Sequence, residues 1–166
     1  MRKTLMNPGI LAAAILAASF VPPALAADFI WPNTGRISST WKYPDGSIHT
    51  GSADIAAATW THIGAARGGT AHPYRDPVGA NSVKIAHGHG YHTIYKHMVR
   101  WPSVRDGQKV DRNHLIGYVG STGNSTGPHC HFAIMRYGTR LIIPHLRIGD
   151  HVRRGRPVPG NYAGLP

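Results

Sequence analysis

Turn-forming residues divide this chain into pieces that are too short for helices of ordinary length. Glycine occurs 20 times and proline 13 times among the 166 residues, and beyond the N-terminal segment no stretch keeps apolar residues at the helical spacing of 3.6. Short apolar runs between turn signals instead predict strands at residues 37–41, 48–57, 83–87, 92–98, 115–119, 129–137 and 140–143. The pattern predicts an all-β fold with little or no helix, built as an antiparallel sandwich or partly open barrel.

The first 26 residues have the composition of a secretory signal peptide. Basic Arg2 and Lys3 precede an apolar run at residues 10–21, and small residues at 24–26 form a cleavage site. The run is shorter than the roughly 20 residues that span a bilayer, and the well-formed cleavage site argues against an uncleaved anchor. We therefore expect export to a periplasm or the extracellular space, with no retained membrane segment.

Removal of this segment would leave residues 27–166, the size of one domain. The formal charge would fall from +11 to +9 with the loss of Arg2 and Lys3, and this favours attraction to polyanions. Export points to anionic polymers of the cell envelope. Nucleic acid is not expected, because the chain lacks basic strands rich in aromatic residues. The densest basic cluster, formed by Arg153, Arg154 and Arg156, is predicted to contact the envelope.

The segment S-T-G-N-S-T-G-P-H-C-H-F, residues 121–132, holds the most chemistry. Turn residues end just before a predicted strand that begins at His129. Residues two apart on a strand share a face, so His129 and His131 present two imidazoles together while Cys130 and Phe132 face the other way. Such a pair suits a metal; the alternative is two histidines on a solvated face. Cys130, the only cysteine, is expected to be a buried apolar residue and not a ligand.

A second pair of potential ligands is His49 and Asp54, in H-T-G-S-A-D-I-A. They could supply one nitrogen and one oxygen to a divalent metal. A separation of five places them on opposite faces of a regular strand, so a bulge or turn at residues 51–53 is needed to bring them to one side. The alternative is that Asp54 binds a nearby backbone amide.

A further histidine stands near the end of the predicted strand at residues 92–98. Alternation puts Thr93, Tyr95 and His97 on one face and Ile94 and Lys96 on the other. His97 could then face the same cleft as the histidine pair at residues 129–131. The alternative is an ordinary surface histidine.

Glycines predict turns at three other places. H-G-H-G-Y-H, residues 87–92, could be read as a second metal cluster, but its two glycines favour the tip of a hairpin. Residues 104–110 and 146–152 each place a glycine three residues before a valine, which is typical of a tight turn between extended pieces.

The motifs H-T-G-S-A-D-I-A, T-I-Y-K-H-M and G-S-T-G-N-S-T-G-P-H-C-H-F, in this order, resemble the lysostaphin and LytM family of zinc endopeptidases, which cut peptidoglycan peptides. The likeness covers residues 31–144 and leaves a tail at 145–166. It implies a groove between antiparallel strands with one zinc ion per chain at its floor. It also implies that zinc-activated water hydrolyses bonds in stem peptides or cross-bridges of peptidoglycan.

Carried onto this sequence, the resemblance implies that His49, Asp54 and His131 are zinc ligands and that His97 and His129 are an unligated catalytic pair. Strand alternation alone does not separate His129 from His131. The spacing departs from the family at one point: four residues lie between His49 and Asp54, where three are more common.

Some relatives in this family have lost their ligands and act as non-catalytic proteins that bind the wall or activate another wall hydrolase. The unusual spacing of the first motif slightly favours this alternative. A competent residue at every position of the implied site favours the enzyme, with peptidoglycan and muropeptides as its partners.

Overall fold

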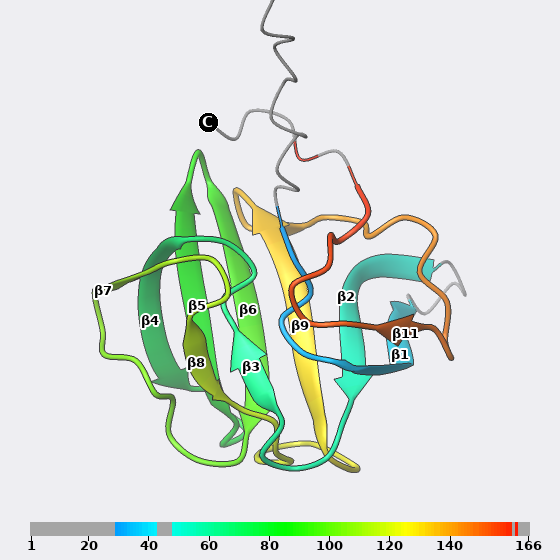
Figure 1. Cartoon of the computed structure of the whole chain (residues 1–166), viewed down its shortest axis with the longest axis horizontal. Helices are drawn as coiled ribbons and strands as arrows, with labels where there is room; N and C mark the ends of the chain where they lie inside the picture. The colour runs from blue at the N-terminus through cyan, green and yellow to red at the C-terminus, as the bar shows by residue number, and fades with distance from the viewer. Residues whose placement is uncertain (1–28, 43–47, 161, 163–166) are drawn as a thin grey trace, which may run out of the picture.

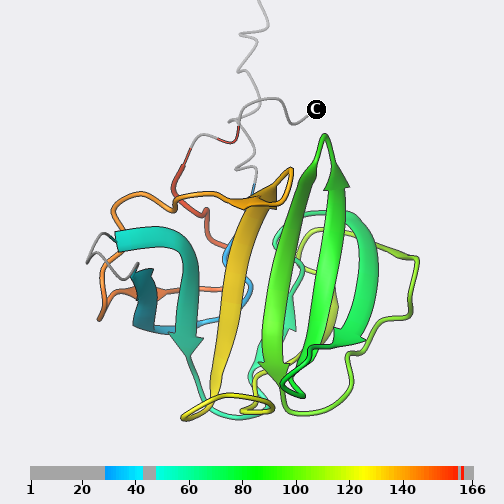
Figure 2. The same cartoon turned by 180° about the vertical axis from the view of Figure 1, so that it is seen from behind.

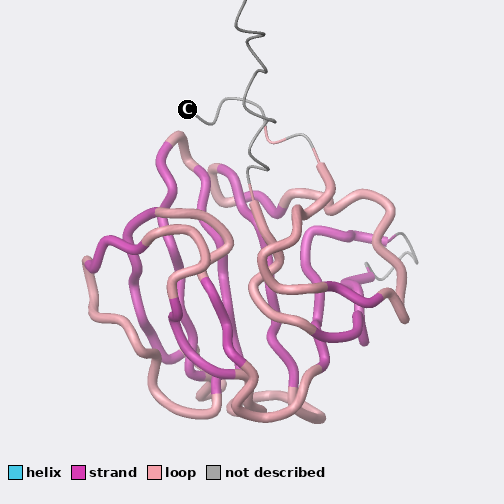
Figure 3. The backbone as a smooth tube through the Cα atoms, viewed as in Figure 1, coloured by secondary structure: helices cyan, strands magenta, loops and turns pink. Residues whose placement is uncertain are grey.

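The structure is a computed structural model that describes residues 29–42, 48–160 and 162. The predicted signal peptide lies outside these residues. Within them the chain forms strands and loops without any helix (Figure 3), so nothing in this part could cross a membrane as a helix. The strands are β1 (Gly35–Lys42), β2 (Ile48–Ala56), β3 (His62–Gly64), β4 (Gly69–Arg75), β5 (Asn81–Gly88), β6 (Tyr91–Met98), β7 (Gln108–Val110), β8 (Leu115–Tyr118), β9 (His129–Arg136), β10 (Thr139–Arg140) and β11 (His151–Val152).

The strands form two antiparallel sheets, which confirms the predicted all-β architecture. The large sheet has the order β11-β1-β2-β9-β6-β5-β4-β7, with β10 paired to β9, and the small sheet is β3-β8. Figures 1 and 2 show β3 and β8 over one face of the large sheet, while no strand formed by the described residues covers β9, β6 and β5 on the opposite face. The core includes residues of both sheets and of the terminal segments, such as Trp31, which packs on Phe132. The opposite face of the large sheet is therefore available for a groove.

The two faces of β9 differ as strand alternation predicts. Cys130 and Phe132 are fully buried in the core, whereas His129 and His131 are partly exposed on the other face. Burial raises the pKa of the Cys130 thiol, so this thiol stays protonated at neutral pH. Cys130 is therefore a small core residue, as expected from the sequence.

Several strands were not evident from the sequence. Strands β3, β7 and β11 have only two or three residues each, too few to show an alternating pattern. Strand β4 contains Pro73, which argues against a strand. The proline is tolerated because β7 pairs only with residues Gly69 to Ala71. The remainder of β4 is therefore an edge on the side of β7, where a residue without a backbone N–H leaves no hydrogen bond of the sheet unmade. The predicted strand at 140–143 was wrong beyond Arg140, where β10 ends.

The predicted turns are present. His89 and Gly90 connect β5 to β6 with φ angles of 49° and 75°, the left-handed conformations of a tight hairpin. Gly107 and Gly149 have φ angles of 75° and 100° and precede β7 and β11. The segment at residues 87–92 is thus the hairpin tip predicted from its glycines.

Candidate active site

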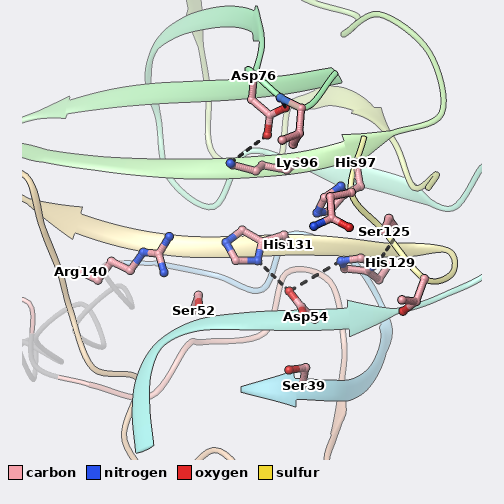
Figure 4. A pocket seen from close by; sticks show the side chains of 13 residues that line it. Ser39, Ser52, Asp54, Asp76, Lys96, His97, Ser125, His129, His131 and Arg140 are labelled. Atoms are coloured by element: carbon pink, nitrogen blue, oxygen red, sulfur yellow. Dashed lines mark hydrogen bonds and ion pairs between the residues drawn. The ribbon is translucent and has the colours of Figure 1, made fainter. Parts of the chain in front are cut away.

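Asp54 and His131 meet on adjacent strands at the centre of the large sheet. They are direct register partners between β2 and β9, and Asp54 Oδ1 lies 2.7 Å from His131 Nδ1 (Figure 4). Burial raises the pKa of Asp54, but the hydrogen bond from His131 and the charges of His131, His129 and His97 together lower it more, and the net shift is downward. Asp54 is therefore an ionised carboxylate at neutral pH, in contact with an imidazole.

The ring of His129 is held with its Nε2 atom toward Asp54. Its Nδ1–H donates to the carbonyl oxygen of Gly127 at 2.8 Å, with the Ser125 hydroxyl at 3.3 Å from the same nitrogen. Its Nε2 lies 3.8 Å from Asp54 Oδ1. Because Nδ1–H is bonded to the carbonyl, Nε2 is the ring nitrogen that faces the Asp54 carboxylate.

His97 reaches the site through an unusual backbone conformation. Its φ angle is 68°, a left-handed value that is uncommon for any residue except glycine. Its Nδ1–H donates to the carbonyl oxygen of Thr122 at 2.8 Å, and its ring centroid is 4.5 Å from that of His129. Burial is the main cause that lowers the pKa of His97, so the neutral ring is favoured.

This conformation corrects the face assignment made from alternation. Thr93 and Tyr95 are fully buried in the core, whereas Lys96 lines the same cavity as His97. His97 therefore does not share a face with Tyr95. Lys96 and His97 instead lie on the same side of the sheet. The left-handed backbone turns His97 to the groove side, where regular alternation would send it into the core.

The position of the His49 side chain lies outside the part of the chain that the structure describes. Its backbone belongs to β2, which bends near its beginning (Figure 1). The β1–β2 register shifts between the Thr40–Ala53 pair and the Lys42–Ile48 pair, in the segment where a bulge was predicted. That His49 joins Asp54 and His131 as a metal ligand stays a prediction.

One cavity of about 350 Å³ brings the four other candidate residues together. Asp54 comes from β2, His97 from β6, and His129 and His131 from β9. Sequence reasoning missed the residues that line the rest of the cavity: Ser39, Ser52, Asp76, Val78, Lys96, Asn124, Ser125, Thr126 and Arg140. Five of these residues lie within the motifs quoted above, but sequence reasoning gave them no role in the site: Ser52, Lys96, Asn124, Ser125 and Thr126.

The donors in this cavity are of the kinds that zinc uses. Asp54 supplies a carboxylate oxygen and His131 an imidazole nitrogen, and the two converge within hydrogen-bonding distance. In the described ranges no group of three His, Cys, Asp or Glu side chains is arranged to hold a metal. Two described donors thus fit a zinc ion, and His49 is the candidate for a third.

Comparison with known proteins identifies the family. Residues 47–143, more than half of the chain, match the model of peptidase family M23, and the chain therefore belongs to this family. The resemblance to lysostaphin-type enzymes inferred from the motifs is confirmed.

Relatives and solved structures agree with this assignment. ShyA, a peptidoglycan DD-endopeptidase of Vibrio cholerae, is 39% identical over 95 residues, or 57% of this chain and 17% of ShyA. A zinc-containing peptidase from Vibrio cholerae has a TM-score of 0.60 and 28% identity over 69% of this chain and 38% of that chain. The catalytic domain of lysostaphin from Staphylococcus simulans has a TM-score of 0.51 and 26% identity, and the match covers 63% of this chain and 80% of that domain. The chain spans less than a fifth of the length of ShyA.

Proposed function

We propose that this chain is an exported, zinc-dependent endopeptidase that hydrolyses peptide bonds in the stem peptides or cross-bridges of peptidoglycan. Membership of family M23 and the similarity to ShyA support the substrate class. The observation that carries the proposal is the shared cavity. His97 and His129, each with Nδ1 bonded to a backbone carbonyl, lie beside the contact between Asp54 and His131.

Asp54, His131 and His49 would hold the metal. Catalytic zinc sites use three protein ligands of these types and leave a further position for water. Zinc, when bound, supplies Lewis acidity that lowers the pKa of water and polarises the scissile carbonyl. The family resemblance assigns His97 and His129 the unligated catalytic positions, so neither ring is included in the proposed ligand set.

His97 and His129 would move protons. In its neutral form each ring has an Nε2 lone pair, because Nδ1–H is bonded to Thr122 or Gly127. That nitrogen can accept a proton from the attacking water and return it to the leaving amine. Once protonated, the same Nε2–H can donate to the oxygen on which negative charge develops. The backbone carbonyls fix the orientation of both rings before substrate binds.

We also infer that the chain is exported and binds the cell wall. The composition of residues 1–26 supports secretion to the periplasm or beyond. The formal charge of +9 that would remain after removal of residues 1–26 supports accumulation on peptidoglycan and other anionic wall polymers. This attraction should weaken as the salt concentration rises.

Hydrolysis of purified peptidoglycan by the mature chain tests the proposal. We expect mass spectrometry to find soluble muropeptides with cleaved peptides. In His129→Ala we expect zinc to be retained and hydrolysis to fall by about 10²-fold or more, the usual contribution of a general acid–base group. His89→Ala, at the exposed hairpin tip, is the matched control and should keep the parent rate. Binding of sacculi without hydrolysis would favour the non-catalytic alternative, and parent-rate hydrolysis by His129→Ala would refute the role of that residue.

A further inference from the structure

A lysine in the cavity has no role in the proposed chemistry. Lys96 is the register partner of His131 between β6 and β9, and its side chain is 27% exposed. Figure 4 shows Arg140 on the side of His131 away from His129, and Lys96 above His131 on neighbouring β6. Two cationic side chains thus lie close to His131 in the groove.

A buried carboxylate holds the Lys96 ammonium in place. Lys96 Nζ lies 3.0 Å from Asp76 Oδ2, and the Asp76 side chain is only 4% exposed. Asp76 Oδ1 also accepts the backbone N–H groups of Val78 at 3.1 Å and Ala80 at 2.8 Å. These bonds fix the carboxylate to its turn, so it positions the ammonium at the cavity wall.

The ammonium keeps donors for a ligand. A lysine ammonium has three N–H donors, and Asp76 needs one of them because backbone amides already serve its other oxygen. Arg140 adds a guanidinium to the lining of the same cavity, a group whose fork matches a carboxylate. Two cations in the lining of a peptide groove are suited to an anionic group on the peptide.

We propose that Lys96 and Arg140 form a subsite that binds a carboxylate of the peptide substrate close to the scissile bond. The inference rests on the proposed function, because it takes the cavity as the peptide-binding groove. It adds a substrate class: peptides with a free carboxylate next to the cleaved bond bind better than the same peptides with that carboxylate amidated. Lys96 supplies a fixed charge and Arg140 a planar pair of donors.

Binding can be measured separately from hydrolysis. The probes are a cross-linked muropeptide dimer and the same dimer amidated with ammonia and carbodiimide. In the His129→Ala chain, isothermal titration calorimetry should give a Kd about 10- to 100-fold lower for the carboxylate form, the range expected for charge-assisted hydrogen bonds. Adding Lys96→Met should remove most of this preference, with little change in the Kd for the amidated form. Lys96→Arg, which keeps the charge beside Asp76, should retain it.

Lys84→Met is the matched control, because Lys84 is an exposed lysine on neighbouring β5 outside the cavity lining. It should leave both Kd values unchanged. Equal affinity of the parent for both forms, or equal weakening of both by Lys96→Met, would overturn the subsite and leave Lys96 as a partner of Asp76 only. Absence of hydrolysis by the parent together with a preserved carboxylate preference would refute the enzyme while supporting the subsite.

Discussion

His87 joins separate segments of the core through a chain of buried hydrogen bonds, and its replacement should change how stability depends on pH. His87 Nδ1–H donates to the carbonyl oxygen of Gly68 at 2.9 Å, and Nε2 lies 2.8 Å from Thr93 Oγ1. The hydroxyls of Thr93 and Tyr95 are 2.7 Å apart, and the backbone N–H of Ala66 donates to Tyr95 Oη at 2.8 Å. A neutral imidazole satisfies this chain, with Nε2 accepting from Thr93.

The magnitude follows from the pKa of His87, which burial lowers from 6.5 to about 4. Above pH 6.5 the ring is neutral in the folded and the unfolded chain, so it adds no pH dependence. As the pH falls from 6.5 toward 4, the unfolded chain binds a proton that the folded chain does not, and the free energy of unfolding decreases. At about 1.4 kcal/mol per pKa unit, the loss approaches about 3 kcal/mol near pH 4.

Urea unfolding of the parent and His87→Asn between pH 7 and pH 4 measures this contribution. Asn retains an N–H that can reach Gly68 but does not titrate in this range. The free energy of unfolding of the parent should fall by about 3 kcal/mol more than that of the variant. His89→Asn, on the exposed hairpin tip two residues away, should follow the parent. Parallel pH profiles for the parent and His87→Asn would refute the reasoning.

Two further predictions concern the chain segments around His97. Gly120→Ala should destabilise the fold by about 1–3 kcal/mol, the usual cost of overpacking, because the added Cβ would overlap the backbone of Val99 and lie 2.8 Å from the carbonyl oxygen of His97. Gly127→Ala, with open space around it, is the control and should change the free energy of unfolding by less than about 0.5 kcal/mol. Thr122→Val should cost about 1–3 kcal/mol, since the lost hydroxyl accepts the N–H of Asn81 and donates to the backbone at residue 98. The variant should also lower kcat more than it raises KM; an unchanged kcat would contradict a positioning role for this loop.

The strands that build the site were largely predictable because the buried face of each follows a period of two. Alternation correctly separated His129 and His131 from the core residues Cys130 and Phe132. The glycines of the hairpin tip likewise identified the connection between β5 and β6. These signals are local, and a single sequence contains them.

The site is assembled by contacts between residues that are far apart in the sequence. Asp54 and His131 are 77 positions apart, and their contact depends on the β2–β9 register, which no short motif encodes. His97 faces the groove through a left-handed φ angle that is uncommon outside glycine. Alternation correctly put Lys96 opposite Tyr95, but it could not place Lys96 and His97 on the same side. Asp76 comes from a turn after β4, a strand that its own proline concealed. The roles of the site residues came from the motif resemblance, because strand alternation alone does not distinguish ligands from catalytic residues.

The most direct test of the account is the zinc content of the purified mature chain, measured by elemental analysis. The account predicts about one zinc ion per chain, lost in His131→Ala, Asp54→Ala and His49→Ala and retained in His97→Ala. Absence of zinc from the parent, or retention of zinc at the parent level in His131→Ala, would contradict it.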